Sequence, residues 1–458
     1  MRKMSEDCVK KYDDAHFASN KKIRRILLFS AVALVLVVGA VVLVLYLNHF
    51  FYKRANFSVD HAGISEDMSE ALTDTAIDND ALLSRTITLL QDKTGVAPYI
   101  VDWYMIPGSI SSETALASTN LVAEDQILLL RAYIEADRKS DAKELLKAID
   151  EDFVSEDGYI VQSIPVSQVT DITVGTDSVY DLETVTSTDS LEDTIAYLGA
   201  LLLYYDKWGV PSDFTRIEKY ADLLYSESGS FIQNQEVILL TPTPYAIGEG
   251  QDILEAAEET EAETEVVGSL WTLPLSSLDL DVFRMLASYD SKYQVMYDHA
   301  LAILQGGVIS SDIPLYASSY QQDEENYVYT NGGEYQFDLV SSLTVMLHLA
   351  SEDALPTDSV AWIREHLYNE GILYQTYDVI SGQAVSEEES TEAYGLLLQI
   401  AIETDDLTLY TKTLDAVVRN LATSSRSAAF SSVYRRTDAN RVTIYAKDNL
   451  EVYLGVTD

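Results

Sequence analysis

The sequence predicts an all-α protein built from helical hairpins. Apolar residues make up 47% of its 458 residues, which is ordinary for a folded chain and excludes wholesale disorder. They recur at the spacing of amphipathic helices, and few segments alternate with the period of a strand. The hairpins differ in length and share no repeat of fixed period, which disfavours ankyrin or tetratricopeptide arrays. We therefore expect an (α/α)6 six-hairpin barrel preceded by one transmembrane helix.

The first predicted element is a membrane-spanning helix at residues 26–47. This uncharged run of 22 residues would be about 33 Å long at 1.5 Å per residue, enough to cross a hydrocarbon core of about 30 Å. The alternative, a cleaved signal peptide, has an apolar core of about 7–15 residues followed by small residues. Here the run continues into an aromatic and basic collar, Asn48 to Arg54. We therefore expect a retained anchor.

Charges beside that helix predict its orientation. Residues 1–25 contain eight Lys or Arg against four Asp or Glu, so we expect this tail to stay in the cytoplasm while the rest is exported. Residues 48–80 are polar and are interpreted as a juxtamembrane stalk, followed by an extracellular domain at 81–458. The single cysteine, Cys8, lies in the tail. An exported part without cysteine suits the outer face of a Gram-positive cell membrane, which the protein would cross once.

The remaining elements are helices with one apolar face each. A polar insertion interrupts them near residues 243–268, where Glu255 to Glu265 is rich in glutamate. Like charges repel, so we interpret it as a flexible, solvated segment, with an ion-binding or partner-binding loop as the alternative. The predicted helices are centred on residues 80–92, 127–134, 141–149, 193–207, 214–226, 276–289, 292–304, 336–350, 358–369, 391–403, 407–421 and 446–455.

Net charge and cysteine content exclude several classes of function. A net charge of −44 argues against nucleic-acid binding, because the chain would repel phosphates. One cysteine excludes a disulfide framework, a thiolate zinc site and an iron–sulfur cluster. The histidines have no metal-ligand partner at helical spacing, so we expect neither a metal nor a cofactor.

What remains for chemistry is a set of carboxylates at the starts of apolar helices. Glu124 precedes the apolar run from Ile127, and Glu192 and Asp193 follow Ser190 at the start of another helix. Asp338 precedes a third. Burial beside such a helix raises the pKa of a carboxyl group and keeps its proton available. The alternatives are an acid that complements the helix dipole for Glu124, a capping pair for Ser190 and Asp193, and an N-cap for Asp338.

The order of these segments resembles glycoside hydrolase family 8 and its divergent Gram-positive relatives, over roughly residues 90–458. Ala123–Gln126 is similar to the motif that carries the family's general acid, and 188–193 to the acidic pair that touches the central sugar. Residues 336–341 are similar to the segment that carries the base. The resemblance implies an (α/α)6 barrel and inverting hydrolysis. Glu124 would be the acid, Asp338 the base, and Asp193 or Glu192 would hold the sugar.

The resemblance is incomplete at two positions. The family's Gly and Tyr after the acid are absent near Ile127, and the Arg after the base is Ser341 here. These departures imply altered substrate, altered chemistry or lost activity.

Aromatic and polar side chains near the predicted acids are candidates for sugar contacts, because sugars stack on flat apolar rings. Core packing between helices is the alternative for each ring. The candidates are Trp103, Tyr104, Asp189, Tyr197, Trp271 and Tyr394.

Together these features predict a membrane-anchored extracellular glycoside hydrolase that trims an exopolysaccharide, with a polysaccharide or oligosaccharide, the lipid bilayer and components of an exopolysaccharide synthase as partners. The acidic surface favours a neutral or cationic glycan. The alternatives are a catalytically impaired glycan-binding or assembly subunit, and a helical scaffold without a sugar site. Convergence of Glu124, Asp193 and Asp338 in one groove lined by aromatic rings would distinguish them.

Overall fold

The chain forms two compact units in the computed structural model, Met1–Ala55 and Asn56–Asp458. The structure describes residues 28, 33–44, 57, 62–107, 116–169, 188–209, 211–225, 273–321, 326–329, 335–438 and 441–457.

Residues 33–44 of the first unit are helical and exposed. Within the described ranges, no helix combines the length and the apolar character needed to cross a bilayer. The predicted span at 26–47 lies only partly within those ranges, so it stays a prediction. The predicted tail at 1–25 and the acidic insertion near 243–268 lie outside the described residues.

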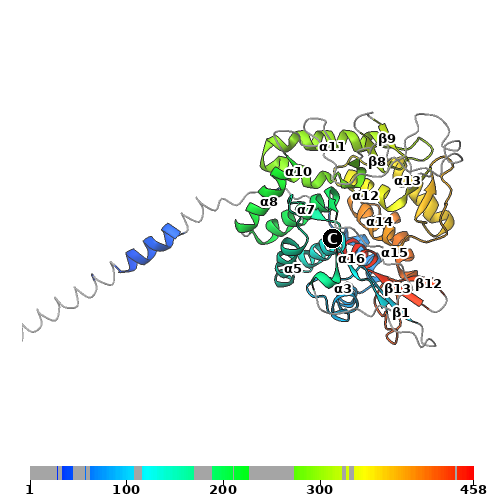
Figure 1. Cartoon of the computed structure of the whole chain (residues 1–458). Helices are drawn as coiled ribbons and strands as arrows, with labels where there is room; N and C mark the ends of the chain where they lie inside the picture. Colours follow the sequence, from blue (N-terminus) through cyan, green and yellow to red (C-terminus); the bar gives the residue numbers. More distant parts are fainter. Residues whose placement is uncertain are drawn as a thin grey trace, which may run out of the picture. The chain divides into compact units, whose positions relative to one another are not determined.

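The second unit is a closed ring of inner helices surrounded by outer helices, as predicted (Figure 1). Each inner helix contacts the next one along the chain, and the last contacts the first. The inner helices are α4 (Ala123–Glu135), α7 (Leu191–Trp208), α10 (Leu280–Tyr289), α12 (Leu339–Ala350), α14 (Thr391–Glu403) and α16 (Ala446–Gly455). The outer helices are α3 (Asn79–Ile87), α5 (Lys139–Asp152), α8 (Pro211–Leu224), α11 (Gln294–Gly306), α13 (Thr357–Glu370) and α15 (Leu407–Arg419).

The inner and outer helices differ in how much of their surface is buried and apolar. The inner helix α14 is buried along almost its whole length, from Thr391 to Ile402. The outer helix α5 buries one stripe only, Ala142, Leu145, Leu146 and Ile149. A helix that is apolar on most sides is stable between neighbours, whereas an amphipathic helix needs one face in water. The layer of each helix therefore follows from its pattern.

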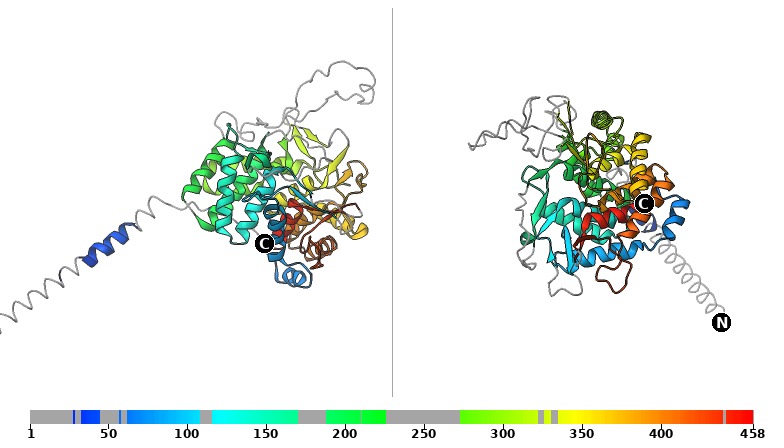
Figure 2. Two further views of the ribbon diagram at one scale, coloured as in Figure 1. Left: turned by 60° about the horizontal axis from the view of Figure 1, so that its bottom comes forward. Right: turned by 90° about the vertical axis from the view of Figure 1, so that its right-hand side faces the viewer.

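The last two inner helices, α14 and α16, pack very closely against each other (Figure 2). Gly395 lies against α16, where a Cβ atom would stand 2.5 Å from the carbonyl carbon of Glu451 and 2.6 Å from the nitrogen of Val452. Gly455 lies against α14 in the same way, since its Cβ would be 2.5 Å from that of Leu398. Only glycine permits this approach at both positions, so the two helices pack backbone against backbone.

Short strands hold the loops that lead into the inner helices. β3, β6, β10 and β13 each end at the residue before α4, α7, α12 and α16, and each pairs with a neighbouring strand. The described strands are two to five residues long, too short for an alternating pattern to reveal them. They are β1 (Trp103–Pro107), β2 (Leu116–Ala117), β3 (Asn120–Val122), β4 (Ile160–Val161), β5 (Ser163–Pro165), β6 (Asp189–Ser190), β7 (Leu273–Pro274), β8 (Ser319–Gln321), β9 (Asn326–Val328), β10 (Gln336–Asp338), β11 (Thr376–Asp378), β12 (Arg435–Asp438) and β13 (Arg441–Tyr445).

The predicted stalk at 48–80 is too long. The second unit begins at Asn56, and helix α2 (Glu66–Thr73) lies within the stalk range and packs against α15. Ser65 caps α2, and Met68 is buried. One apolar contact on a short polar helix was not enough to predict it. The remaining short helices are α6 (Val166–Val169), η1 (Thr88–Asp92), η2 (Leu275–Ser277) and η3 (Ser291–Tyr293).

Candidate active site

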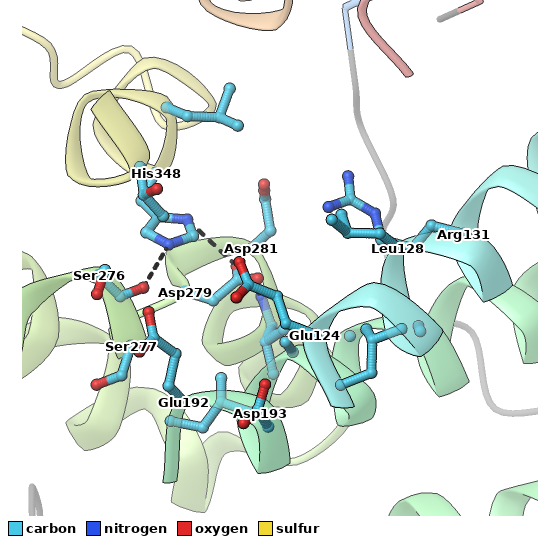
Figure 3. Close-up of a pocket in the computed structure, with 18 of the residues that line it drawn as sticks. Glu124, Leu128, Arg131, Glu192, Asp193, Ser276, Ser277, Asp279, Asp281 and His348 are labelled. Carbon is cyan, nitrogen blue, oxygen red and sulfur yellow. Dashed lines mark hydrogen bonds and ion pairs between the residues drawn. The ribbon is translucent and has the colours of Figure 1, made fainter. Parts of the chain in front are cut away.

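A pocket of about 160 Å³ opens inside the ring of inner helices. Its described lining contains seven carboxylate side chains, and the carboxyl groups labelled in Figure 3 face one hollow. The carboxylates are Glu124 on α4, Glu192 and Asp193 on α7, Asp279 and Asp281 at the start of α10, Glu392 on α14 and Glu451 on α16. Most stand in the first turn of an inner helix, where the helix dipole favours negative charge.

Lys447, in the first turn of α16, binds one of these carboxylates. Its Nζ forms an ion pair with Glu124 Oε2. Burial opposes the charge of Lys447, but the carboxylates of Glu124, Glu392 and Asp125 outweigh that effect and raise its pKa well above the usual value. The charge of Lys447, on α16, therefore stabilises the carboxylates at the starts of α4 and α14.

Asp193 has the properties of a proton donor. Its side chain is 8% exposed, and burial together with the negative charge of Glu124 raises its pKa to about 8. Glu392 has a pKa of about 8 as well, chiefly because it is buried. At neutral pH the carboxyl group of Asp193 thus holds a proton, while the neighbouring Glu124 is ion-paired. A protonated acid beside a carboxylate is the pair that acid–base chemistry requires.

Asp125, the residue after Glu124 in α4, is fully buried. Neither oxygen of its carboxyl group has a hydrogen-bond partner among the described residues. Burial, and then the charge of Asp102, raise its pKa well above the usual value. A buried, unpartnered carboxylate is costly, so Asp125 is held in its neutral form.

His348 on α12 closes another side of the pocket. Its Nε2 lies 3.0 Å from the backbone oxygen of Ser276, which accepts a hydrogen bond, so Nε2 carries the hydrogen. Its Nδ1 faces Asp279 Oδ1 at 3.8 Å (Figure 3). Asp279 also caps α10 by accepting from the nitrogen of Val282 at 3.2 Å. The imidazole therefore links α12 to the start of α10.

The expectation that Asp338 joins this pocket is wrong. Asp338 is the N-cap of α12 and accepts hydrogen bonds from the nitrogen and the Oγ of Ser341, at 2.8 and 3.0 Å. The part of α12 that lines the pocket is Thr344, Leu347 and His348. Thr344 is six residues further along the helix, which is about 9 Å at 1.5 Å per residue. The cap thus stands away from the pocket.

The predicted sugar contacts from aromatic rings do not line the pocket either. Tyr197 and Tyr394 are fully buried, and their hydroxyls donate to Asp150 and Glu389 at 2.8 and 2.6 Å, so these two rings pack the core. Trp103 and Tyr104 lie in β1 beside β13, and Asp189 pairs with Val161 in the β4–β6 sheet. Trp271 lies outside the described residues. Among the described lining residues, the imidazole of His348 is the only ring.

Sequence reasoning missed the contribution of the last hairpins. The starts of α14 and α16 were noted as helix starts, but Glu392, Lys447 and Glu451 received no role. An acid or a lysine in the first two turns of a helix that is apolar on all sides, as in α14 and α16, could have identified these residues as candidates for the site. No group of three or more His, Cys, Asp or Glu side chains in the described ranges has the geometry of a metal site.

Comparisons with known proteins show the fold. No protein-family model and no curated protein matches the chain. A solved alpha-amylase from Clostridium perfringens, described as novel, has a TM-score of 0.59 and 20% identity, covering 84% of this chain and 97% of that one. Rex8A from Paenibacillus barcinonensis, solved with xylose, has a TM-score of 0.51 and 11% identity, covering 86% and 95%. Endoglucanase Cel10 from Klebsiella pneumoniae, a family 8 glycosyl hydrolase, has a TM-score of 0.49 and 10% identity, covering 74% and 99%. The chain is therefore similar in fold to the Clostridium perfringens and Paenibacillus barcinonensis proteins.

Proposed function

We propose that the chain is a glycoside hydrolase whose acid–base pair is Asp193 and Glu124. The observation that carries the proposal is that these two carboxyl groups, from different inner helices, line one pocket, where Asp193 holds a proton at neutral pH and Glu124 is ion-paired with Lys447. Inverting hydrolysis needs an acid on the leaving oxygen and a carboxylate that activates water. This pair replaces the one implied by the sequence resemblance, in which Glu124 was the acid and Asp338 the base.

In this mechanism Asp193 donates its proton to the glycosidic oxygen as the bond to the anomeric carbon breaks. Glu124 accepts a proton from the attacking water on the opposite face of the ring, and the water oxygen forms the new bond to carbon. Lys447 keeps the Glu124 carboxylate in place through their ion pair. The neutral form of Asp193 is required, so activity should fall as the pH rises through about 8.

The proposed setting is the outer face of a cell membrane, with an exopolysaccharide as substrate. The uncharged run at 26–47 and the basic tail before it support an anchor with its N-terminus in the cytoplasm. The net charge of −44 supports a neutral or cationic glycan over a polyanion. Components of an exopolysaccharide synthase are natural neighbours of such an enzyme. Protease treatment of intact cells tests the orientation, because only an exported domain is degraded.

Hydrolysis by matched variants tests the chemistry. Release of reducing ends from a panel of glucans, xylans and amino-sugar polymers is measured for the wild type, Glu124→Gln, Asp193→Asn and Asp338→Asn. We expect the first two variants to lose at least about a hundredfold in kcat, as is typical for a removed general acid or base. Asp338→Asn keeps the oxygen that caps α12, so it should remain active. A wild type inactive on every polymer would contradict the proposal.

A second candidate is a glycan-binding or assembly subunit without catalysis. It is favoured by the absence of Asp338 and of aromatic rings other than that of His348 from the described lining of the pocket. In that case glycan binding would persist in Glu124→Gln and Asp193→Asn, and no polymer would be cleaved.

A further inference from the structure

Arg131 stands on the wall of the pocket, inward from the acid–base pair. Glu124, Ile127, Leu128 and Arg131 all line the pocket, at positions i, i+3, i+4 and i+7 of α4. This spacing places them on one face of the helix. Arg131 stands seven positions after Glu124 in α4, so it lies about 10 Å further along the barrel axis. Figure 3 shows its guanidinium beside the same hollow as Asp281.

The hydrogen-bond donors of Arg131 are unused by the described part of the chain. None of the hydrogen bonds or close ion pairs there involves Arg131. Its positive charge acts electrostatically on the carboxyl group of Glu451, whose pKa it lowers. Other arginines of the barrel are paired: Arg284 with Asp281 at 2.7 Å, and Arg435 with Asp448. A guanidinium has five N–H donors, and the half-buried Arg131 presents them to the hollow. Arg131 is therefore available to acceptors that enter the pocket.

The hollow continues along the axis past Arg131. A smaller cavity of about 60 Å³ shares Arg131, Leu203, Asp281 and Leu347 with the pocket. Its other lining residues, such as Gln399 and Glu403, lie nearer the C-terminal ends of the inner helices. Both volumes are below the about 300–1,000 Å³ of sites that hold drug-sized ligands. The two hollows are too small for a polymer passing through the barrel, so they suit a chain end of one or two sugars.

Glu451 provides an acceptor beside these donors. Its side chain is 7% exposed and lines the pocket, and Gln399 Nε2 holds its Oε2 by a hydrogen bond of 2.6 Å. A sugar hydroxyl is both a donor and an acceptor, so one ring can accept from Arg131 and donate to Glu451. Apolar side chains, among them Leu128 and Leu203, form the walls between them.

We propose that the pocket takes the end of a glycan and not its middle, with the terminal neutral sugar ring lying along the barrel axis and its hydroxyls bound by Arg131 and Glu451. This inference rests on the proposed hydrolase function and adds its mode of action. Cleavage at Glu124 and Asp193 then releases a terminal unit of one or two sugars. Arg131 binds the substrate before and during the reaction, so its removal raises KM more than it lowers kcat.

The test uses the full chain in detergent with hexasaccharides of glucose, in α-1,4 and β-1,4 linkage, and of xylose, each labelled at its reducing end. We expect mono- or disaccharides as the first products, from one end only. Arg131→Met should raise KM about ten- to a hundredfold, as for a lost hydrogen bond to a charged group, with a smaller change in kcat. Arg131→Lys should recover part of the loss. Arg138→Met, which removes a surface pair with Asp141, is the matched control.

Trisaccharides among the first products, or an unchanged KM in Arg131→Met, would overturn the inference while leaving the hydrolase in place. A wild type that cleaves none of the sugars contradicts the hydrolase instead. In that case saturation-transfer NMR on the bound hexasaccharides decides the binding mode. Signal concentrated on a terminal ring, and lost in Arg131→Met, supports end-on binding. Signal on internal rings, or no binding, overturns it.

Discussion

Replacing Asp193 by Asn should make the protein less sensitive to alkaline pH. Asp193 has a pKa of about 8 in the folded chain, against an ordinary value of 3.8. The folded state therefore holds a proton that the unfolded state loses, and stability falls as the pH rises between these values. The full difference corresponds to about 6 kcal/mol, because one pKa unit equals 1.36 kcal/mol. Between pH 5 and pH 8 the part that is lost is about 4 kcal/mol.

Asn keeps the shape of the side chain and an oxygen acceptor but does not titrate. The assay is urea unfolding of residues 56–458 at pH 5, 6, 7 and 8, followed by circular dichroism, with the free energy of unfolding of the wild type subtracted from that of Asp193→Asn. We expect this difference to grow by about 4 kcal/mol in favour of the variant over that range. Asp415→Asn, at an exposed carboxylate of α15, is the control. Parallel pH profiles for wild type and Asp193→Asn would refute the assignment of the proton to Asp193.

Three further predictions concern the ring that holds the pocket. Lys447→Met removes the counter-charge of Glu124 and should lower the free energy of unfolding by about 2 kcal/mol at pH 7. The control Lys412→Met, at an exposed pair on α15, should change it little. Equal effects of the two variants would contradict the role of Lys447. Arg435→Gln breaks the ion pair with the fully buried Asp448 and should cost about 3 kcal/mol in the same urea assay, against a small effect for Arg138→Gln at the surface. Gly395→Ala places a methyl group against the backbone of α16 and should lower the free energy of unfolding by about 1–3 kcal/mol. Gly63→Ala, where the new Cβ meets open space, should leave it unchanged. A fully stable Gly395→Ala would show that α14 and α16 can move apart.

Long helices were predictable from the sequence because their periodic pattern extends over many residues. The predicted ranges 391–403 and 446–455 coincide with the bounds of α14 and α16. The closed ring followed from the unequal hairpins and the family resemblance together. The short strands were not predictable, because two to five residues carry too little pattern and their pairing depends on neighbours distant in sequence.

The candidate site was predictable in part. Glu124 and Asp193 were identified because each opens an apolar helix, and the structure places both in the pocket. Asp338 fits the same description but caps a helix that enters the pocket only from Thr344 onward. A cap residue marks where a helix begins along the chain. It does not show where along the barrel axis that helix begins. The ion pair of Lys447 with Glu124 spans more than 300 positions, so no local pattern could reveal it.

The position of α16 as the last inner helix has a consequence for biosynthesis. Lys447 and Glu451 both come from this helix, and α3, near the beginning of the second unit, packs against it. While the residues between α4 and α16 are synthesised, Glu124 therefore has neither its lysine partner nor the wall of the pocket that α16 provides. Contacts between such distant segments form slowly. The wall that α16 contributes to the pocket would then form only after α16 packs against α3 and α4, which are made much earlier.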